Sequence, residues 1–580
     1  MTNRAPNPLS RAVRVIAATM GGAAALLAAT LSHGVLAHVK PALVASVDTR
    51  YNLQSQRLNA NRDLYLFTAS DGRTDAQILS ELKTDPVVSG ATLNTVIRLN
   101  GQSSASVLNG QSSASVLNGQ SSASVLNGQS SASVLNGESS ILEQSSASVL
   151  NEDVNYFGTR APSEYVYQPL VSQVAAGERT HERATGRGIT VAEIDNGIDQ
   201  FNPVLRKVLL EDGWNFFDNT PNWSAWADLG QSSASVLNGQ SSASVLNGGL
   251  NGGSQPIVLD QSSASVLNNL WEKLLGQSSA SVLNGCTTSS GATAGLSATL
   301  PSVLTTLDQS SASVLNGPGR VQLTNLLLKL INQILQCDPD FGHGTSVAGI
   351  IHLIAPEAKI LPIKAFGPGG VADASVIYQS LTYAIDHHAD VINLSFSSGA
   401  LDPHVQEALD EALSKGIIIV AAAGNASTSA AAYPAALTDA NGAVIGVGAV
   451  DGCNAPAPTT QDPTPGCIAN PQLILASFSN FDAPGVILDA DVAAPGVQLI
   501  TTFPGFGLIW ARSSGTSFSA PVVSGEAALL AELRQMGGAN RSEIENTADP
   551  SIPGDLNGEL GHGLVQVLGA VKSAPPLHKH

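Results

Sequence analysis

The sequence predicts an α/β protein of three layers, in which a mostly parallel central sheet is covered by helices on both faces. From Gly188 onward, short and fully apolar segments alternate with longer segments of helical character. Strands that are apolar on both faces are typical of a parallel sheet buried between two helix layers. Aromatic residues make up only 4% of the chain, while alanine, glycine and valine are abundant. This composition suits a closely packed α/β core.

The apolar segments give the expected strands, and two segments between them give the expected helices. The strands are residues 189–194, 360–365, 391–395, 417–422 and 444–450. The helices are residues 371–388 and 403–415, the second of which stops at Gly416. Active sites in such sheets lie at the carboxyl ends of the strands. Residues that follow these strands are therefore the first candidates for function.

Ser517 lies in the segment GTSFSAP, residues 515–521, directly before an apolar-periodic stretch that predicts a long buried helix. Pro521 falls in the first turn of this helix, where a missing N–H has little cost. The hydroxyl is thus placed at a helix N-terminus, where free N–H groups favour negative charge. A nucleophile that attacks a carbonyl needs this environment, because negative charge develops on the substrate oxygen. The plain alternative is an N-cap serine with no chemical role.

Three further segments supply partners for such a nucleophile. Asp195 ends the first expected strand, and His343 lies between two glycines at the start of an apolar helix. A serine needs a base to take its proton, and the base needs a carboxylate that fixes its tautomer. Asn425 follows the fourth expected strand and offers a side-chain amide suited to an oxyanion hole. The order along the chain is Asp, His, Ser.

At these four points the chain resembles the subtilisin-like serine peptidases, the subtilase family, whose catalytic residues follow the same order. The resemblance covers roughly residues 162–571. It implies a subtilisin-like fold, with Asp195 as the orienting acid, His343 as the general base, Ser517 as the nucleophile and Asn425 as the oxyanion donor. It also implies a serine endopeptidase that hydrolyses peptide or protein substrates through an acyl-enzyme, with no cofactor required for catalysis.

The same resemblance implies where substrate binds. Segments 366–370 and 394–397 are similar to the two segments between which subtilases hold an extended peptide. The substrate-binding residues are then Gly369, Gly370, Leu394, Ser395 and Phe396. Many relatives bind structural calcium, and we expect that calcium is possible here, without an assigned site.

One departure from the family pattern is large. Asp195 and His343 lie 148 positions apart, several times the usual interval. We therefore expect an insertion between about residues 214 and 336 that forms a surface excursion outside the sheet. The α/β-hydrolases are excluded, because their motif Gly-x-Ser-x-Gly needs a glycine at position 519 and their order is Ser, Asp/Glu, His.

Ten identical copies of the octapeptide QSSASVLN interrupt the chain, five between Gln102 and Asn151 and five between Gln231 and Asn316. Perfect identity in different contexts indicates recent duplication. Two strongly apolar residues in each copy are too few to build a stacked core. We expect inert surface spacers, with an adhesive or ligand-binding array as the alternative. The competing function for the whole chain is a catalytically silent exported scaffold whose repeats bind a surface.

The N-terminus has the form of a secretory leader. Three arginines precede an apolar stretch over residues 15–31, and residues 35–37 offer a small-residue cleavage site. An uncleaved signal anchor is the alternative. We expect a secreted monomer, extracellular or periplasmic, that is not held in a membrane after the leader is removed. The net charge of −19 argues against a nucleic-acid partner.

The expected organisation is a signal peptide over residues 1–37, a propeptide over 38–100, a repeat linker over 101–151, a catalytic domain over 152–573 and a tail over 574–580. Within the propeptide, residues 64–67 and 96–99 predict strands and residues 76–82 predict a helix. Many relatives carry such a segment, which assists folding and blocks the cleft. The alternative is a disordered export linker.

Four cysteines suit an exported protein. Of the three possible connectivities, the economical one joins Cys286 to Cys337 and Cys453 to Cys467.

Overall fold

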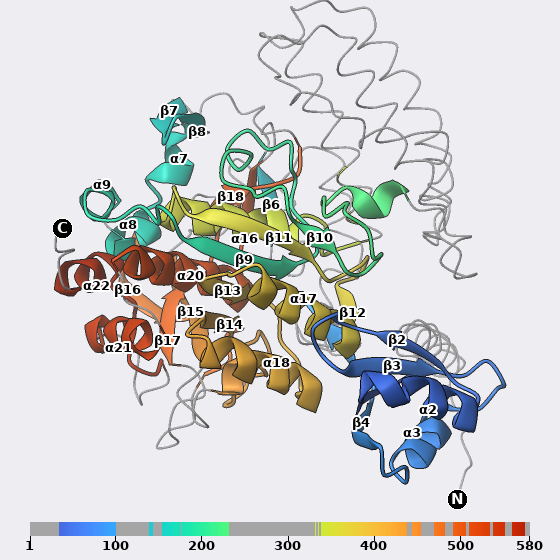
Figure 1. The fold of residues 1–580 in the computed structure, drawn as a ribbon. Helices are drawn as coiled ribbons and strands as arrows, with labels where there is room; N and C mark the ends of the chain where they lie inside the picture. The colour runs from blue at the N-terminus through green and yellow to red at the C-terminus, as the bar shows by residue number, and fades with distance from the viewer. Residues whose placement is uncertain are drawn as a thin grey trace, which may run out of the picture.

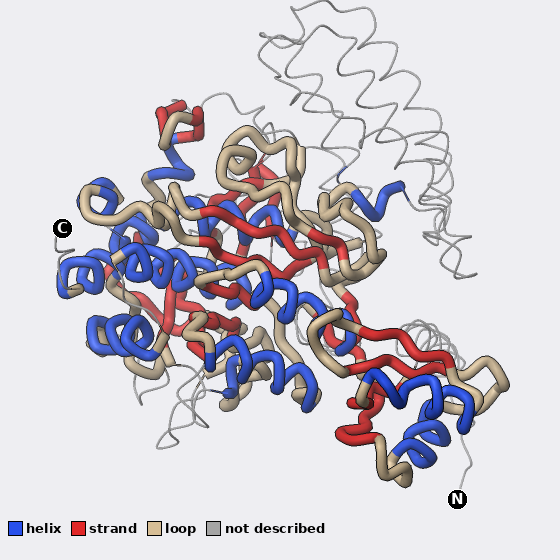
Figure 2. Tube along the Cα trace, viewed as in Figure 1, coloured by secondary structure: helices blue, strands red, loops and turns tan. Residues whose placement is uncertain are grey.

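The computed structural model describes residues 34–99, 139–142, 153–175, 177–230, 331, 335, 338–437, 444–453, 469–481, 491–505, 510–533, 537–551 and 560–574. Figure 1 shows a small N-terminal domain, drawn in blue, beside a larger α/β domain. The tube in Figure 2 shows the strands of the larger domain gathered at its centre with helices on either side.

The larger domain is built on an eight-stranded sheet. The strand order is β10 (Trp214–Asn215), β11 (Lys359–Lys364), β9 (Thr190–Asp195), β13 (Val391–Leu394), β14 (Ile418–Ala422), β15 (Val444–Cys453) and β16 (Ala469–Leu475), and β17 (Val492–Pro495) also pairs with β15. All of these neighbours are parallel except β15 and β16. The expected parallel sheet is confirmed, and its five predicted strands are present.

Helices cover both faces of this sheet, as Figure 1 shows. One layer holds α16 (His343–Ile354), α20 (Thr516–Glu532), α21 (Gly538–Thr547) and α22 (Val567–Ser573), and the other holds α17 (Ala374–Asp386) and α18 (Pro403–Ser414). Because side chains alternate along a strand, Val191 and Ile360 pack with the first layer while Ala192 and Leu361 pack with the second. The three-layer α/β fold is therefore confirmed.

Smaller elements surround these layers. They are β12 (Val371–Asp373), the sheet of β18 (Leu499–Thr502), β19 (Trp510–Ser513) and β6 (Ser139–Leu142), the hairpin β7 (Asp153–Tyr156) and β8 (Thr159–Pro162), the short helices α7 (Ser163–Val166), α8 (Pro169–Ala175) and α9 (Glu178–His181), and the 3-10 helices η2 (Ala227–Gly230) and η5 (Ala435–Leu437). No helix in the described parts of the chain has both the length and the apolar character needed to cross a membrane.

The N-terminal domain is a folded βαββαβ unit. Its elements are β1 (Val35–Val39), the 3-10 helix η1 (Pro41–Leu43), α2 (Val44–Tyr51), β2 (Gln54–Arg57), β3 (Leu64–Thr68), α3 (Asp75–Leu82) and β4 (Val88–Leu93), and β5 (Val96–Arg98) follows it. The sheet order is β2-β3-β1-β4 with antiparallel neighbours. Val35, Phe67 and Ile78 belong to a core of its own. A disordered linker is therefore the wrong alternative for this segment.

The expected boundary at residue 37 falls inside β1. Val35, Leu36 and Ala37 have no exposed surface, because β1 is an inner strand that pairs with both β3 and β4. The folded N-terminal domain therefore includes residues that were assigned to the leader. The apolar stretch of the leader, residues 15–31, lies outside the described residues.

The expected start of the insertion, near Trp214, is also wrong. Residues 214–215 form β10 and extend the sheet beside β11. The following residues are built into the domain, because Trp226 Nε1 donates to Asp199 at 3.1 Å and Asp228 lies 2.9 Å from the buried amine of Lys364. A buried amine needs a counter-charge, and the sequence supplies it from within the segment expected to be an excursion.

Several expectations fall outside the described residues. All ten repeat copies lie there, and so do Cys286, Cys337 and Cys467. Of the residues between the copies in the first group, only β6 is described. Cys453 ends β15, and its side chain is not described. The cysteine pairings and the spacer role of the repeats therefore stay predictions.

The expected helix over residues 371–388 is shorter than predicted. Its first three residues form β12, which pairs with β5 of the N-terminal domain. A strand partner from another part of the chain overrides the local helical preference here.

Glu526 provides a test of this core. It lies in α20 with no exposed surface, and neither carboxyl oxygen has a hydrogen-bond partner among the described residues. Burial raises its pKa to about 8. Between its unfolded value of about 4.5 and about 8, the folded chain holds a proton that the unfolded chain releases. The contribution of Glu526 to stability should therefore be largest below this window and fall by about 1.4 kcal/mol per pH unit across it.

We expect Glu526→Gln to remove this contribution. Both the variant and the parent carry Ser517→Ala to prevent self-digestion. The thermal midpoint of the variant minus that of the parent should be more positive at pH 8 than at pH 5. Any fixed cost of the buried amide cancels in this comparison. An equal difference at both pH values would contradict the prediction.

Candidate active site

The structure brings the four predicted residues to one edge of the sheet. Asp195 is the last residue of β9, and Asn425 follows β14. His343 is the first residue of α16 and Ser517 is the second residue of α20. Parallel strands end at the same edge, and both helices begin there. Segments that are far apart in sequence thus converge.

Asp195 and His343 form a buried pair. His343 Nδ1 lies 2.9 Å from each carboxylate oxygen of Asp195. Asp195 is 1% exposed and His343 is 5% exposed, so little solvent competes for this contact. The backbone N–H of Asn196 donates to Asp195 Oδ1 at 2.7 Å. With Nδ1–H held by the carboxylate, Nε2 is the nitrogen that can take up a proton.

Asn196 is a positioning residue that the sequence analysis did not assign. Its Oδ1 accepts a hydrogen bond from Gly344 N at 3.0 Å, and its Nδ2 donates to the carbonyl of Asp340. The loop after the acid is thereby tied to the first turn of the helix that carries the base. Gly344 is required at this contact, because a Cβ there would lie 2.6 Å from the carbonyl oxygen of Gly197. An amide directly after the acid is the only sequence signal for this role.

Contacts of the first turn of α20 set the position of Ser517. The ring of Phe518 lies 5.2 Å from the ring of His343, centroid to centroid, so the base packs against the residue after the nucleophile. Ser395 Oγ donates to the carbonyl oxygen of Ser517 at 2.8 Å. Asn393 Nδ2 donates to Ser395 Oγ at 2.9 Å and so links β13 to this turn.

Asn425 is held with its carbonyl oxygen toward the same turn. Its Oδ1 accepts from the backbone N–H of Thr516 at 2.9 Å and from Thr516 Oγ1 at 3.0 Å. This fixes the orientation of the amide, because both donors require the oxygen on their side. The Nδ2 lies near Gly515, 3.5 Å from where a Cβ would stand. The amide can therefore donate to an oxygen placed beside Ser517.

Glu193 is a second buried carboxyl group beside Asp195, and the sequence analysis did not single it out. It is 1% exposed, and neither oxygen has a hydrogen-bond partner in the described part of the chain. Burial and the nearby charge of Asp195 raise its pKa well above the usual value. This shift favours the neutral carboxyl, which would add no second negative charge beside Asp195. The available signal was a second acid, two residues before Asp195, within a mostly apolar strand.

The predicted substrate segments hold another part of the same chain. β5 pairs in antiparallel register with β12, and Leu99 N donates to the carbonyl oxygen of Gly370 at 2.8 Å. On its other side, Arg98 forms an antiparallel bridge with Ser397. Residues 96–99 thus lie between the two segments in the manner of an added strand.

Of the five predicted substrate residues, Gly370 accepts the hydrogen bond from Leu99 N, and the other four take different places. Gly369 is exposed, and its N–H donates to Asp338 Oδ1 at 2.9 Å. Leu394 and Phe396 are buried in the core beside α17 and α18. The Ser395 side chain is also buried and serves Ser517 instead. Any contact of these three with a substrate would therefore come from the backbone.

Comparison with known proteins agrees with this geometry. The model described as "Subtilase family" matches residues 186–563, which is more than half of the chain. This chain belongs to the subtilase family.

Two relatives illustrate the extent of the similarity. The chain is 36% identical over 217 residues to "Thermophilic serine proteinase" from Bacillus sp. (strain AK1), covering 36% of this chain and 47% of that protein. It is 31% identical over 243 residues to "Subtilisin Savinase" from Lederbergia lenta, covering 40% of this chain and 78% of that protein. The match thus spans about half the length of the first relative.

A solved structure shows the same fold. Fervidolysin from Fervidobacterium pennivorans, described as a keratinolytic enzyme related to subtilisin, superposes with a TM-score of 0.53 and 16% sequence identity. The match covers 94% of this chain and 62% of that chain. It supports the subtilisin-like architecture of this subtilase.

The neutral state of Glu193 can be tested through the reactivity of Ser517 with a fluorophosphonate. We expect Glu193→Gln to leave the pH dependence of the labelling rate unchanged, because the carboxyl already lacks a charge. An ionised Glu193 would stabilise protonated His343, so its removal would move the acid limb to lower pH. Such a shift would contradict the prediction. As the control, Asp195→Asn should slow labelling by up to the order of 10⁴.

Proposed function

We propose that this subtilase is a serine endopeptidase whose catalytic residues are Asp195, His343 and Ser517, with Asn425 as oxyanion donor. The single observation that carries the proposal is the buried 2.9 Å contact between Asp195 and His343 Nδ1, next to the helix turn that presents Ser517. This contact leaves Nε2 of the imidazole as the base. A catalytically silent scaffold would not require a buried pair of Asp195 and His343.

The reaction follows from the atoms in place. Ser517 Oγ attacks the carbonyl carbon of the scissile bond while its proton passes to His343 Nε2. The imidazolium is stabilised by Asp195 and then gives this proton to the leaving amine, so that an acyl-enzyme and the first product form. Water then gives a proton to His343 as it attacks the ester, and His343 returns this proton to Ser517 Oγ as the acid product leaves. The negative oxygen of each tetrahedral intermediate would accept a hydrogen bond from Asn425 Nδ2.

The substrates we propose are extended peptides or unfolded protein segments. A strand added between β12 and Ser397 would make backbone hydrogen bonds on both sides, as residues 96–99 do now. Backbone pairing of this kind depends little on side chains. We therefore propose broad specificity, and the catalysis itself uses only groups of the chain.

We propose further that the N-terminal domain, which ends with this strand, is an inhibitory propeptide. Ile97 and Leu99 are buried in one core with Phe366 and Phe396 of the larger domain. A substrate and residues 96–99 cannot occupy the same place. Removal of the domain would therefore be needed for activity. We also propose, from membership of the subtilase family, that the protein is secreted, is a monomer and can bind structural calcium.

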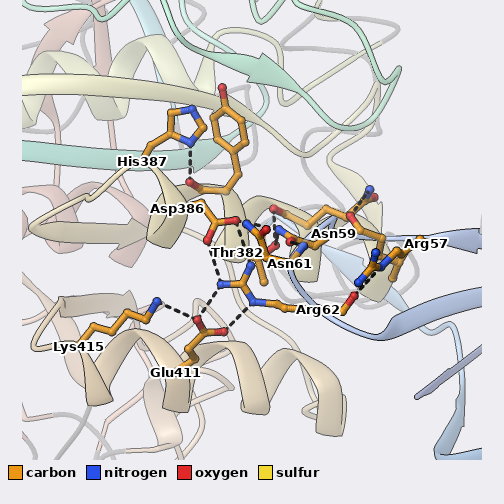
Figure 3. A network of polar contacts seen from close by, with 12 residues as sticks. Arg57, Asn59, Asn61, Arg62, Thr382, Asp386, His387, Glu411 and Lys415 are labelled. Carbon is orange, nitrogen blue, oxygen red and sulfur yellow. Dashed lines mark hydrogen bonds and ion pairs between the residues drawn. The ribbon is translucent and has the colours of Figure 1, made fainter. Parts of the chain in front are cut away.

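A charged network holds the N-terminal domain to the larger domain at a second place, shown in Figure 3. Arg62 donates to both oxygens of Glu411 on α18, each at 2.7 Å. It also donates to both oxygens of Asp386 at the end of α17, at 3.0 and 3.1 Å. Two bidentate contacts from one guanidinium fix orientation as well as distance.

The peptidase proposal is tested with a fluorophosphonate probe on the purified, matured chain. We expect labelling of the wild type and none of Ser517→Ala, because the probe reacts only with an activated serine. Cleavage of an unfolded protein substrate should be lost in the same variant. Absence of labelling in the matured wild type, with a folded catalytic domain shown by circular dichroism, would contradict the proposal.

The propeptide proposal is tested with Arg62→Ala. The variant should release the N-terminal domain sooner and reach full activity earlier, because Asp386 and Glu411 lose their partner. The hydrogen bond from Arg62 lowers the pKa of Glu411, so this contribution is present above the usual glutamate pKa and is lost as pH falls through the lowered value. Acid should therefore narrow the difference between variant and wild type.

Lys40→Ala is the matched control, since Lys40 is an exposed cation of the same domain. Its activation time course should follow the wild type. An Arg62→Ala time course that also follows the wild type would show that the network does not hold the domain in place.

A further inference from the structure

A cavity lies between the N-terminal domain and α18. His38 of β1 and Gly90 of β4 line it from one side, and His404 and Glu407 of α18 line it from the other. The chemistry-bearing side chains in this cavity therefore come from both domains. No step of the proposed peptide hydrolysis uses them.

Three of these side chains are arranged like metal ligands. Ligand atoms of His38, His404 and Glu407 all lie within 4.8 Å of one another. His38 Nε2 is 2.9 Å from Glu407 Oε2, and His404 Nδ1 is 3.6 Å from the same oxygen. Two imidazoles and one carboxylate form the ligand set of many three-residue zinc sites, in which water completes the coordination.

The surroundings of His38 call for an added positive charge. Its Nδ1 lies 3.0 Å from Asp63 Oδ1, and its Nε2 faces Glu407. A neutral imidazole has one N–H, so if Nδ1 donates to Asp63, the lone pair on Nε2 points at a carboxylate oxygen. A cation between them removes this conflict. A carboxylate that holds the other ring nitrogen is also the usual outer partner of a metal-bound histidine.

His404 supplies an independent observation. Its side chain is 3% exposed, and its buried Nε2 has no hydrogen-bond partner within the described residues. A proton on His38 would satisfy both carboxylates but would leave this nitrogen unpaired, whereas an ion that His404 binds through Nε2 would pair it. A metal ion gives both histidines a role, and so the second imidazole favours a metal over a proton.

Gly90 makes room for the two rings. Its φ is +62°, and a Cβ there would lie 3.2 Å from His404 Cε1 and 3.4 Å from His38 Cδ2. The first distance is shorter than an ordinary contact and the second is at its lower limit. The left-handed backbone conformation at Gly90 also disfavours other residues. The backbone of β4 is thus shaped to the pair of imidazoles.

We propose that His38, His404 and Glu407 bind one divalent transition-metal ion of the zinc class, with Asp63 orienting His38. Calcium and magnesium prefer sites made wholly of oxygen ligands, which this site is not. The ion joins β1 of the N-terminal domain to α18 of the catalytic domain. The metal-binding proposal does not depend on the peptidase proposal. An effect of the metal on the release of the N-terminal domain does depend on it.

The test uses the full chain with Ser517→Ala, so that the N-terminal domain stays attached whatever the activity. Zinc is titrated in competition with a chromophoric chelator, and thermal midpoints are measured with and without zinc. We expect one tight equivalent and a rise in the midpoint. His38→Ala and His404→Ala should each lose this equivalent, and cobalt(II) in the parent should give the intense visible bands of a four-coordinate site that both variants lack.

Glu407→Gln keeps the test decisive if a histidine variant fails to fold, because Glu407 is 56% exposed and its replacement should be tolerated. It should weaken binding by about tenfold or more, as loss of a metal-site group usually does. Asp410→Asn, an exposed acid on the same helix, is the control and should bind like the parent. Equal zinc binding by Glu407→Gln and the parent, or no zinc-dependent midpoint in the parent, would overturn the proposal.

Discussion

The first turn of α20 is the constraint on which the site depends. Three separate segments reach this one turn: Asn425 through Thr516, Ser395 through the carbonyl of Ser517, and His343 through the ring of Phe518. The helix itself is buried almost to its end. Its position is therefore set by packing on the sheet, and the hydrogen bonds refine it. A shift of this turn would disturb Asn425, Ser517 and His343 together.

The site keeps a single negative charge by protonating a neighbour. Glu193 and Asp195 point to the same face of β9, since side chains two residues apart share a face. Two ionised carboxylates in a buried place would repel each other, and burial already disfavours charge. The pKa of Glu193 is accordingly raised, while Asp195 has His343 and the N–H of Asn196 as partners. The environment of each group, and not its residue type, decides which of them carries the charge.

The N-terminal domain is held by contacts of different physical kinds. Ile97 and Leu99 contribute apolar burial, Arg62 contributes charge-assisted hydrogen bonds, and β5 contributes backbone pairing. Apolar burial changes little with pH, whereas the charged contacts weaken when carboxylates are protonated. Contacts of such mixed kinds can hold the domain at one pH and weaken at a lower pH. This combination is consistent with the proposed role of the domain as a propeptide.

The sequence by itself was enough to predict the candidate catalytic side chains and the buried strands. Asp195, His343, Asn425 and Ser517 stand in short segments whose glycines and apolar runs have local causes, so a local pattern was enough to find them. Most strands of the main sheet are apolar on both faces, which few other structures allow. The N-terminal segment was harder, because β2 is polar throughout and residues 35–37 of β1 also fit a cleavage site.

Only the tertiary structure decided which segments pair across the chain. β10 is too short to predict alone and exists because β11 offers an edge, and β12 is a strand because β5 lies beside it. Ser395 serves Ser517, and His38 meets His404, over separations in sequence that carry no periodic signal. Local propensity is a property of neighbours along the chain. Pairing between distant segments depends on where the whole fold places them, and no local pattern records that.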